Sequence, residues 1–186
     1  MGAILTQSTS WVNVELAMRN LREEKMFSPA ALERVKLGPL ATLIRPSGYF
    51  RQKAKRLKAF VEFLRRNFQG SLARMFRTST ADLRERLLGV HGIGPETADS
   101  ILLYAGGQPV FVADAYSKRI LVRHGWIGEK AEYEEVRGFF EKHMERDAQR
   151  FNKFHALIVQ AGKQWFRPRD PLCGECPLGR LLEEGR

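Results

Sequence analysis

The chain has 186 residues, a formal net charge of +10 and 44% hydrophobic residues. That hydrophobic content suffices for a packed core and excludes a disordered or collagen-like chain, while the charge points to a polyanion, first of all nucleic acid. No apolar run reaches the roughly 18 to 20 residues that a membrane span requires, so a transmembrane protein is excluded.

The two cysteines, Cys173 and Cys176, lie together near the C-terminus in a C-x-x-C arrangement. A single pair of this kind provides no disulfide framework. The residues after Met1 lack the basic segment that opens a secretory signal. We therefore expect a cytoplasmic protein that keeps both thiols reduced.

The first half of the chain is typical of helices separated by Gly, Pro and Ser. Ser10 precedes an apolar face with helical spacing, and Ser28 followed by Pro29 indicates a helix start with proline at the first helical position. Residues 51–67 carry a second stripe at intervals of three and four residues. The two faces consist of Val14, Ala17, Met18 and Leu21, and of Ala54, Leu57, Val61 and Leu64.

Helical spacing continues through the second half of the chain. A helix starts near Thr80, and the following one ends at the Gly106-Gly107 pair. The only strand-like run, residues 110–112, is too short to build a sheet, so we expect an all-α protein. The apolar faces predicted here are Leu83, Leu87 and Leu88; Ala98, Ile101, Leu102 and Ala105; Tyr133, Val136 and Phe140; and Phe154, Leu157, Ile158, Ala161 and Trp165.

The most informative segment is residues 88–98, which place a helix, a Gly-Ile-Gly turn and a second helix in succession. The glycines permit a positive φ and a close backbone approach, so amide groups at the start of the second helix can bind an anion. On a basic protein we expect a DNA phosphate there, with a monovalent cation at the hairpin as a further candidate ligand. The alternative is an ordinary helix corner closed by glycine; the small residues of the second helix favour DNA.

The hairpin is followed by Gly106-Gly107, Pro109 and, after a short apolar run, Asp114. In this order of motifs the chain resembles the helix-hairpin-helix DNA glycosylases, which include endonuclease III, the adenine glycosylase and the bacterial 3-methyladenine glycosylases. Residues 4–9 and 44–54 resemble the first barrel helix and the wedge loop of that family. The resemblance covers nearly the whole chain and is closest to the 3-methyladenine branch.

The resemblance implies two helical lobes that flank a DNA-binding cleft. Residues 1–108 would form a lobe of the six-helix-barrel type, with the helix-hairpin-helix at about 87–106, and residues 109–186 a C-terminal helical lobe. It also implies a monomer that acts on double-stranded DNA containing a damaged base. The family has a further stretch before the helix that carries Gln7, whereas here this helix begins at Met1, so a truncated and inactive relative is an open alternative.

Asp114 is the catalytic residue that the resemblance implies. Hydrolysis of an N-glycosidic bond passes through an oxocarbenium-like sugar, and a carboxylate can stabilise that charge and orient or deprotonate a water molecule. The alternative role for Asp114 is the N-cap of a helix over Ala115–Arg123. The two roles are compatible.

Glu96 stands where bifunctional members of the family carry a lysine. A carboxylate cannot form the imine through which that lysine cleaves the strand, so we expect a monofunctional enzyme. Glu96 would then be a pocket residue that raises the pKa of Asp114 if the two are close; a solvent-facing position at the helix start is the alternative.

Alkylated purines such as 3-methyladenine are the favoured substrates, because they carry positive charge and leave easily. Two further alternatives stay open. One is a bifunctional glycosylase/lyase of the endonuclease III type, which Glu96 disfavours. The other is a non-catalytic repair protein that binds DNA through the hairpin.

Eight basic residues between Arg45 and Arg66 face a single acid, Glu62, and indicate contacts to the DNA backbone. A solvated helix face explains part of this set. By resemblance, Gln7 fills the gap left by an everted base and Tyr49 wedges the opposite strand; a core position is an equal alternative for Tyr49. The expected DNA-binding residues are Gly92, Ile93, Gly94, Thr97, Gln7, Tyr49, Arg51, Lys53 and Lys118.

Iron–sulfur members of the family close the C-terminus with four cysteines. Cys173 and Cys176 match the middle pair, but Phe166 and Leu182 stand at the outer positions, and two thiolates cannot hold a four-cysteine cluster. We therefore expect no cofactor and no metal at this loop, with Trp165 and Phe166 packed as core. Zinc held with a remote histidine is a disfavoured alternative.

Overall fold

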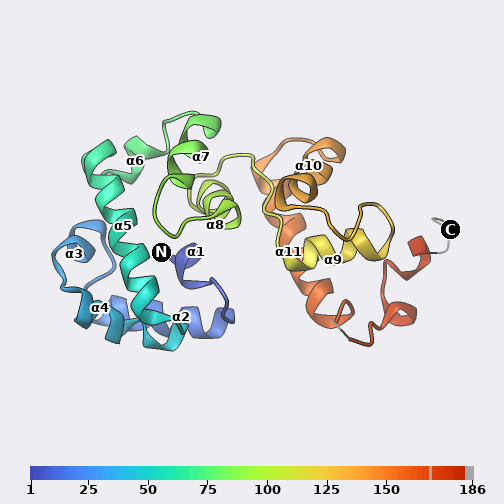
Figure 1. Ribbon diagram of the computed structural model, residues 1–186, viewed down its shortest axis with the longest axis horizontal. Coiled ribbons are helices and arrows are strands. Elements are labelled where there is room, and N and C mark those ends of the chain that lie inside the picture. The colour runs from blue at the N-terminus through green and yellow to red at the C-terminus, as the bar shows by residue number, and fades with distance from the viewer. Residues whose placement is uncertain (168, 183–186) are drawn as a thin grey trace. The chain divides into compact units, whose positions relative to one another are not determined.

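The computed structural model describes residues 1–167 and 169–182, and its regular structure there is helical (Figure 1). Within these two stretches no strand occurs; residues 110–112 are irregular and buried. The prediction of an all-α protein is confirmed. None of the helices described is long and apolar enough to cross a membrane.

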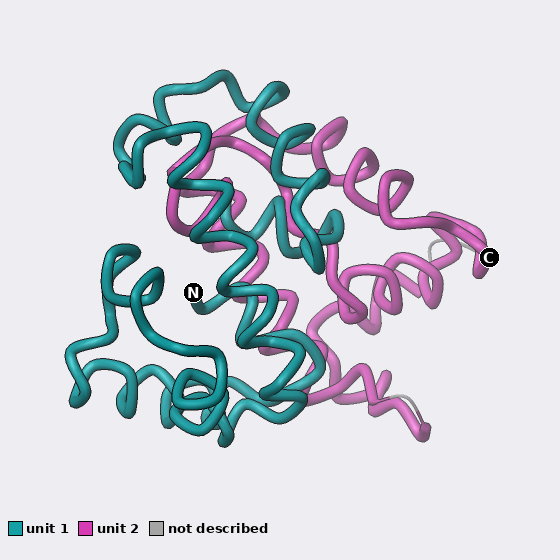
Figure 2. Tube along the Cα trace, turned by 60° about the vertical axis from the view of Figure 1, so that its left-hand side comes forward, with its two compact units in different colours: residues 1–101 teal, residues 102–186 magenta. Residues whose placement is uncertain are grey.

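The chain divides into two compact units, Met1–Ile101 (unit 1) and Leu102–Arg186 (unit 2), which Figure 2 distinguishes by colour. The sequence predicts a boundary between the two lobes after residue 108. In the structure the division comes earlier, after the first residue of the π-helix η2 (Ile101–Ala105).

Unit 1 is organised around α5 (Phe50–Phe68), its longest helix (Figure 1). Helix α5 packs against α1, α3, α4 and α6, while α7 packs against α8. These other helices of unit 1 are α1 (Gly2–Leu5), α2 (Trp11–Glu23), α3 (Pro29–Arg34), α4 (Leu37–Leu43), η1 (Arg45–Ser47), α6 (Leu72–Met75), α7 (Thr80–Leu88) and α8 (Pro95–Ser100).

The apolar faces predicted for unit 1 form its core, because helical spacing places each set on one side of its helix. Ser28 caps α3 as predicted, its hydroxyl accepting a hydrogen bond from the Ala31 amide, whereas Ser10 precedes α2 without such a bond. Met18 is only partly buried and Leu88 is exposed. The buried members are Val14, Ala17, Leu21, Ala54, Leu57, Val61, Leu64, Leu83 and Leu87.

Lys53 departs from its predicted role as a DNA-binding residue. Its side chain is only 1% exposed, and its ammonium group donates hydrogen bonds to the carbonyl oxygens of Leu5, at 2.8 Å, and Ser47, at 2.6 Å. Lys53 stands four residues before Leu57 on the buried face of α5, so the helix turns it inward. It joins α1 and η1 to α5 and is not a phosphate contact.

Unit 2 packs α9 (Ala115–Arg123) against α10 (Tyr133–His143) and α11 (Ala148–Gln164), followed by the short turns η3 (Cys173–Glu175) and η4 (Gly179–Leu182). Its core is aromatic. Phe111 stacks on Phe140 with ring centroids 4.2 Å apart and meets Phe151 edge-on at 5.6 Å. Phe166 belongs to the same core and Trp165 packs against it, as predicted.

The buried face of α11 differs from the predicted one. Ile158 is buried, but Phe154 and Leu157 are 38% and 52% exposed, and Phe151 and Gly162 complete the buried face instead. At Gly162 the ring of Tyr116 of α9 lies directly against the helix backbone, and a Cβ there would come within 2.2 Å of the ring.

The apolar stripe that begins at Ala98 also differs from the predicted one. Ile101 and Leu102 are buried as predicted, but Ala105 is exposed. Because η2 is a π-helix, each of its turns holds more residues than an α-turn, so the face shifts for the residues that follow. Gly107, with φ +62°, follows this segment and ends the helical run.

Substitution Lys53→Met tests the buried lysine. Burial, followed by the charge of Arg56, lowers the pKa of Lys53 from 10.5 to about 8. Between pH 8 and 10.5 the unfolded chain therefore binds more protons at this residue than the folded chain, so its contribution to folding becomes more favourable as the pH rises. A methionine side chain does not titrate, so it lacks this pH-dependent contribution to stability. It also leaves the carbonyl groups of Leu5 and Ser47 without the donor that Lys53 provides.

We expect the variant to lose about 1–3 kcal/mol of unfolding free energy at pH 10, and less at pH 7. Denaturant titrations at both pH values measure the difference. Lys55→Met, on the exposed side of the same helix, is the matched control and should show no such dependence on pH. A Lys53→Met deficit that shrinks from pH 7 to pH 10 would contradict the prediction.

Candidate active site

Asp114 follows the buried run of residues 110–113 and is the N-cap of α9. One of its carboxylate oxygens, Oδ1, accepts hydrogen bonds from the Ser117 amide at 2.8 Å and the Ser117 hydroxyl at 2.9 Å. The predicted capping role is confirmed. It occupies one oxygen and fixes the direction of the other.

The second oxygen of Asp114 faces a histidine. Oδ2 lies 3.6 Å from Nε2 of His155, and the two side chains are 15% and 12% exposed. On its other side His155 has Nδ1 2.5 Å from the phenol oxygen of Tyr104. Three elements of unit 2 therefore bring a carboxylate, an imidazole and a phenol into one row.

The pKa of Asp114 is lowered from its ordinary value of 3.8. Burial alone raises the pKa, but the neighbouring His155, together with the Ser117 amide and hydroxyl, outweighs burial. Asp114 is therefore ionised at neutral pH. The expectation that Glu96 raises this pKa applied only if the two carboxylates are close; Glu96 belongs to unit 1 and Asp114 to unit 2, and it stays a prediction.

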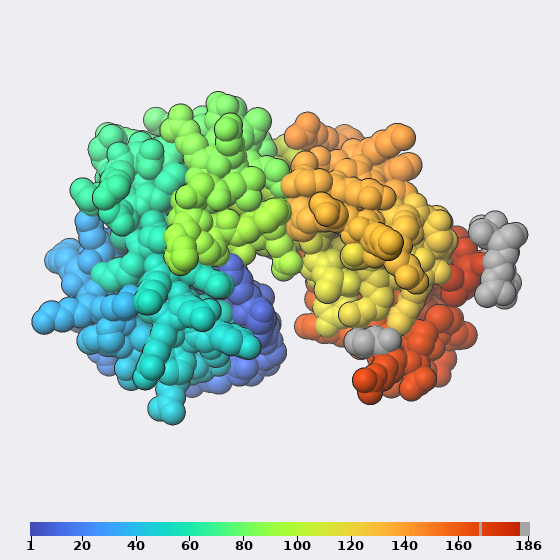
Figure 3. Space-filling view, in the orientation of Figure 1, coloured from blue at the N-terminus to red at the C-terminus, as the bar shows by residue number. Residues whose placement is uncertain are grey.

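The hairpin in unit 1 has the predicted helix–turn–helix order and lies on the face shown in Figure 3. Gly92 adopts φ +79°, a left-handed conformation that disfavours other residues. Gly94 is exposed and is the N-cap of α8. Below the turn, Arg84 of α7 forms a two-point ion pair, at 2.7 and 3.1 Å, with the fully buried Asp99 of α8.

Gln7 is held against this hairpin. Its amide nitrogen donates to the Gly92 carbonyl at 3.1 Å and to the Thr97 hydroxyl at 2.8 Å. Arg56 of α5 donates to the Gln7 side-chain oxygen. Gln7 was predicted to fill the gap in a base stack; in this conformation both ends of its amide are engaged within unit 1, and it must release these bonds to enter DNA.

Two predicted DNA-binding side chains of the hairpin face inward. Ile93 is 4% exposed, and its amide donates to the Val90 carbonyl. Thr97 is 6% exposed and its hydroxyl is bound to Gln7. Both side chains are packed within unit 1 and support the turn, so a contact to DNA at these positions would come from the backbone, whereas Gly94 and Glu96 of the same segment are exposed.

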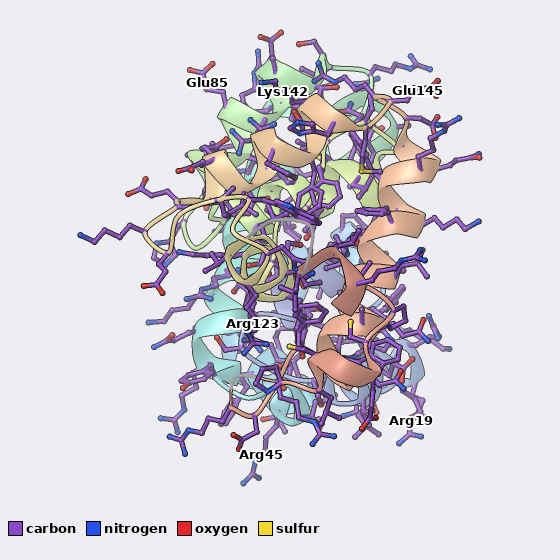
Figure 4. The ribbon with its side chains drawn as sticks, turned by 90° about the vertical axis from the view of Figure 1, so that its right-hand side faces the viewer. Arg19, Arg45, Glu85, Arg123, Lys142 and Glu145 are labelled. Carbon is purple, nitrogen blue, oxygen red and sulfur yellow. The ribbon has the colours of Figure 1, made fainter. Side chains whose placement is uncertain are left out.

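The predicted wedge loop presents Tyr49. This residue has φ +45°, in the left-handed region that few non-glycine residues adopt, and its ring is 68% exposed. A left-handed backbone conformation at an exposed aromatic residue is often functional. The exposure of Tyr49 also excludes the alternative of a core position. Arg51 nearby is exposed, and Arg45 extends away from the ribbon in Figure 4.

The basic residues of α5 separate into two groups. Arg65 pairs with Glu33 at 3.1 Å and Arg66 with Glu62 at 2.5 Å, so both are partly neutralised within the protein. Lys58 donates to the Glu33 carbonyl oxygen. This leaves the end of α5 near Tyr49 as the better candidate for phosphate contacts. In unit 2, Lys118 is half-buried in the first turns of α9.

Both cysteines lie in the part of the chain that the structure describes. Cys176 is buried and Cys173 half-buried, both as free thiols. No cluster of three or more His, Cys, Asp or Glu side chains able to hold a metal ion occurs among residues 1–167 and 169–182. With two cysteines in the whole sequence, the donor set does not fit a four-thiolate cluster.

Sequence comparisons agree with this geometry. The profile of the HhH-GPD superfamily of base excision DNA repair proteins matches residues 1–146. A protein of Methanocaldococcus jannaschii that is assigned as a DNA repair glycosylase is 45% identical over 180 residues, which are 96% of this chain and 81% of the relative. Endonuclease III of Thermotoga maritima is 29% identical, covering 98% of this chain and 80% of its own.

Structure comparisons find related folds. The 3-methyladenine DNA glycosylase of H. pylori, bound to 1,N6-ethenoadenine, superposes with a TM-score of 0.78 at 33% identity and covers 88% of this chain and 82% of that one. A non-covalent endonuclease III–DNA complex gives a TM-score of 0.82 at 23% identity, over 99% and 81% of the two chains. At that identity the second likeness concerns the fold alone.

The hairpin geometry predicts unequal effects of two glycine substitutions. In Gly92→Ala the new Cβ would lie 2.3 Å from Cγ of Arg56, so Arg56 must move away from Gln7. The left-handed backbone adds about 1–2 kcal/mol. Gly94 has φ −93°, and nothing lies within 4 Å of the Cβ that Gly94→Ala would add. This substitution should therefore cost less unfolding free energy. Thermal unfolding of both variants measures this order, and equal losses of stability would refute it.

Proposed function

Because the chain belongs to the HhH-GPD superfamily of base excision DNA repair proteins, and so is a DNA glycosylase, we propose that it hydrolyses the N-glycosidic bond of an alkylated purine and leaves the strand intact. The observation that carries the proposal is the ionised, oriented carboxylate of Asp114 after the hairpin. Its ligand is double-stranded DNA with one everted, damaged base, bound by a monomer.

Asp114 would supply the chemistry of bond cleavage. As the base departs with the bonding electrons, positive charge develops on the sugar, and a carboxylate that is already ionised stabilises this charge without reorganising. The same carboxylate can accept a proton from the water that attacks the sugar. Oδ1 is occupied by Ser117, so Oδ2 is the oxygen that would face the reaction.

Glu96 supports a reaction that ends at the abasic site. It is exposed in the first turn of α8, in the position where bifunctional relatives have a lysine. A carboxylate forms no imine with the sugar, so strand cleavage by β-elimination has no nucleophile at this position. The charge of Glu96 also suits a cationic base better than a neutral one.

The substrate class follows from the same charge argument. Alkylated purines such as 3-methyladenine are already cationic and depart readily, so they need only modest catalysis. The 33% identity to a 3-methyladenine glycosylase supports this class. The net charge of +10 supports binding to the DNA backbone, with an affinity that falls as the salt concentration rises.

A panel of duplexes, each with one lesion, tests the proposal. The panel contains 3-methyladenine, uracil, a thymine mismatch, adenine opposite oxidised guanine and an oxidised pyrimidine. We expect release of the alkylated purine, strand breakage only after alkali, and no covalent product with borohydride. An endonuclease III serves as the positive control for trapping.

Trapped product or breakage without alkali would show a bifunctional enzyme and refute the monofunctional proposal. DNA binding without release from any duplex would instead indicate a non-catalytic relative.

Two substitutions of Asp114 separate its catalytic and capping roles. Asparagine caps a helix about as well as aspartate but carries no charge, so Asp114→Asn should keep the stability and DNA affinity of the wild type. Its excision rate should fall by about 100-fold or more. Asp114→Ala should lose the same activity and, in addition, about 1 kcal/mol of unfolding free energy.

Single-turnover excision, DNA binding and thermal unfolding provide the three measurements. Retention of excision in Asp114→Asn would show that the carboxylate charge is not required.

A further inference from the structure

The row Tyr104–His155–Asp114 contains two groups that the proposed reaction does not use. All three residues belong to unit 2, and they come from η2, α11 and the start of α9. His155 lies between buried neighbours on its helix, Phe151 four residues before and Ile158 three residues after. Its ring meets Phe111 edge-on with centroids 6.3 Å apart. The imidazole is therefore held in place by packing.

The hydrogen-bonding capacities of the row determine the positions of its protons. Burial, followed by the charge of Asp114, raises the pKa of Tyr104 to about 12, so the phenol keeps its proton and can donate it to Nδ1 of His155. An ionised carboxylate only accepts. Nε2 is buried and makes no hydrogen bond within the described residues, its nearest polar neighbour being Oδ2 of Asp114. With the Tyr104 proton donated to Nδ1, the imidazole proton lies on Nε2 and faces Oδ2 of Asp114.

We propose that His155 is a positioning residue for Asp114: Tyr104 fixes the tautomer of His155, and Nε2–H holds Oδ2 of the ionised carboxylate toward the reacting sugar. This inference rests on the proposed function. The separation of 3.6 Å is longer than a hydrogen bond, and such contacts commonly tighten only when substrate is bound.

A neutral donor is the form of histidine that suits this reaction. An imidazolium would neutralise the charge of Asp114, and the carboxylate would then stabilise the cationic sugar less. A neutral Nε2–H orients the carboxylate and leaves its charge intact. The contact with Tyr104 supports this arrangement, because the phenol can donate its proton to Nδ1.

Four variants test the inference. Each is assayed for single-turnover excision on the duplex whose lesion the wild-type protein releases. His155→Leu should reduce the rate by about 10- to 100-fold, as removal of a group that orients a reactive one commonly does, with DNA affinity unchanged. His155→Gln, whose amide can donate toward Oδ2, should recover part of the rate. Tyr104→Phe should give a smaller loss. His143→Leu, an exposed histidine of α10, is the matched control and should excise at the wild-type rate.

The pH profile separates positioning from mere structural support. The groups that face Asp114 are His155 from α11 and Tyr104 from η2, with the Ser117 amide and hydroxyl on its own helix. Removing the His155 donor raises the pKa of Asp114, so the acidic limb of the excision profile should move to higher pH in His155→Leu and not in His143→Leu. An His155→Leu rate within twofold of wild type, with an unmoved limb, would overturn the inference.

Nuclear magnetic resonance tests the row without any substrate. In ¹⁵N-labelled protein the long-range pattern of His155 should be that of the Nε2–H tautomer, and should change in Tyr104→Phe. The carboxyl ¹³C signal of Asp114 should titrate at higher pH in His155→Leu. An Nδ1–H tautomer or an unmoved titration overturns the inference even if no lesion is excised, whereas the expected spectra with no excision on any duplex count against the proposed function alone.

Discussion

The hydrogen bond from the Ser117 amide to Oδ1 of Asp114 is the interaction on which the functional interpretation depends. It starts α9, and it commits one oxygen of the carboxylate to the protein. Since a carboxylate is planar, fixing Oδ1 also fixes Oδ2. One residue therefore stabilises a helix and presents a charge, and the same amide that caps the helix favours the ionised form that glycosidic hydrolysis requires.

Much of the fold was predictable because it follows from local rules. The stripe of α5 is buried since three- and four-residue spacing places its members on one side of a helix. Ser28 and Pro29 start α3 through hydrogen-bonding and φ preferences that act within four residues. The Gly-Ile-Gly turn was recognisable because Gly92 occupies a backbone region that other residues avoid.

The remaining features depend on contacts that no local pattern encodes. Periodicity does place Lys53 on the buried face of α5, but its two carbonyl partners come from other elements. The π-helix η2 changes the helical period without a sequence signal, and Tyr104, which contacts His155, lies within it. His155 lies at helical spacing from Phe151 and Ile158, which marks a buried histidine, yet its partner Asp114 stands on a distant segment.

The ion pair beneath the hairpin constrains how this sequence can change over time. Asp99 is fully buried and Arg84 binds both of its oxygens, so a change that removed the arginine alone would break a buried two-point ion pair, a loss that commonly costs several kcal/mol. Loss of the aspartate alone would break the same pair, with a smaller cost expected because the Arg84 side chain is 17% exposed. We therefore expect positions 84 and 99 to tolerate joint replacement by a pair of matching shape better than replacement of either residue alone.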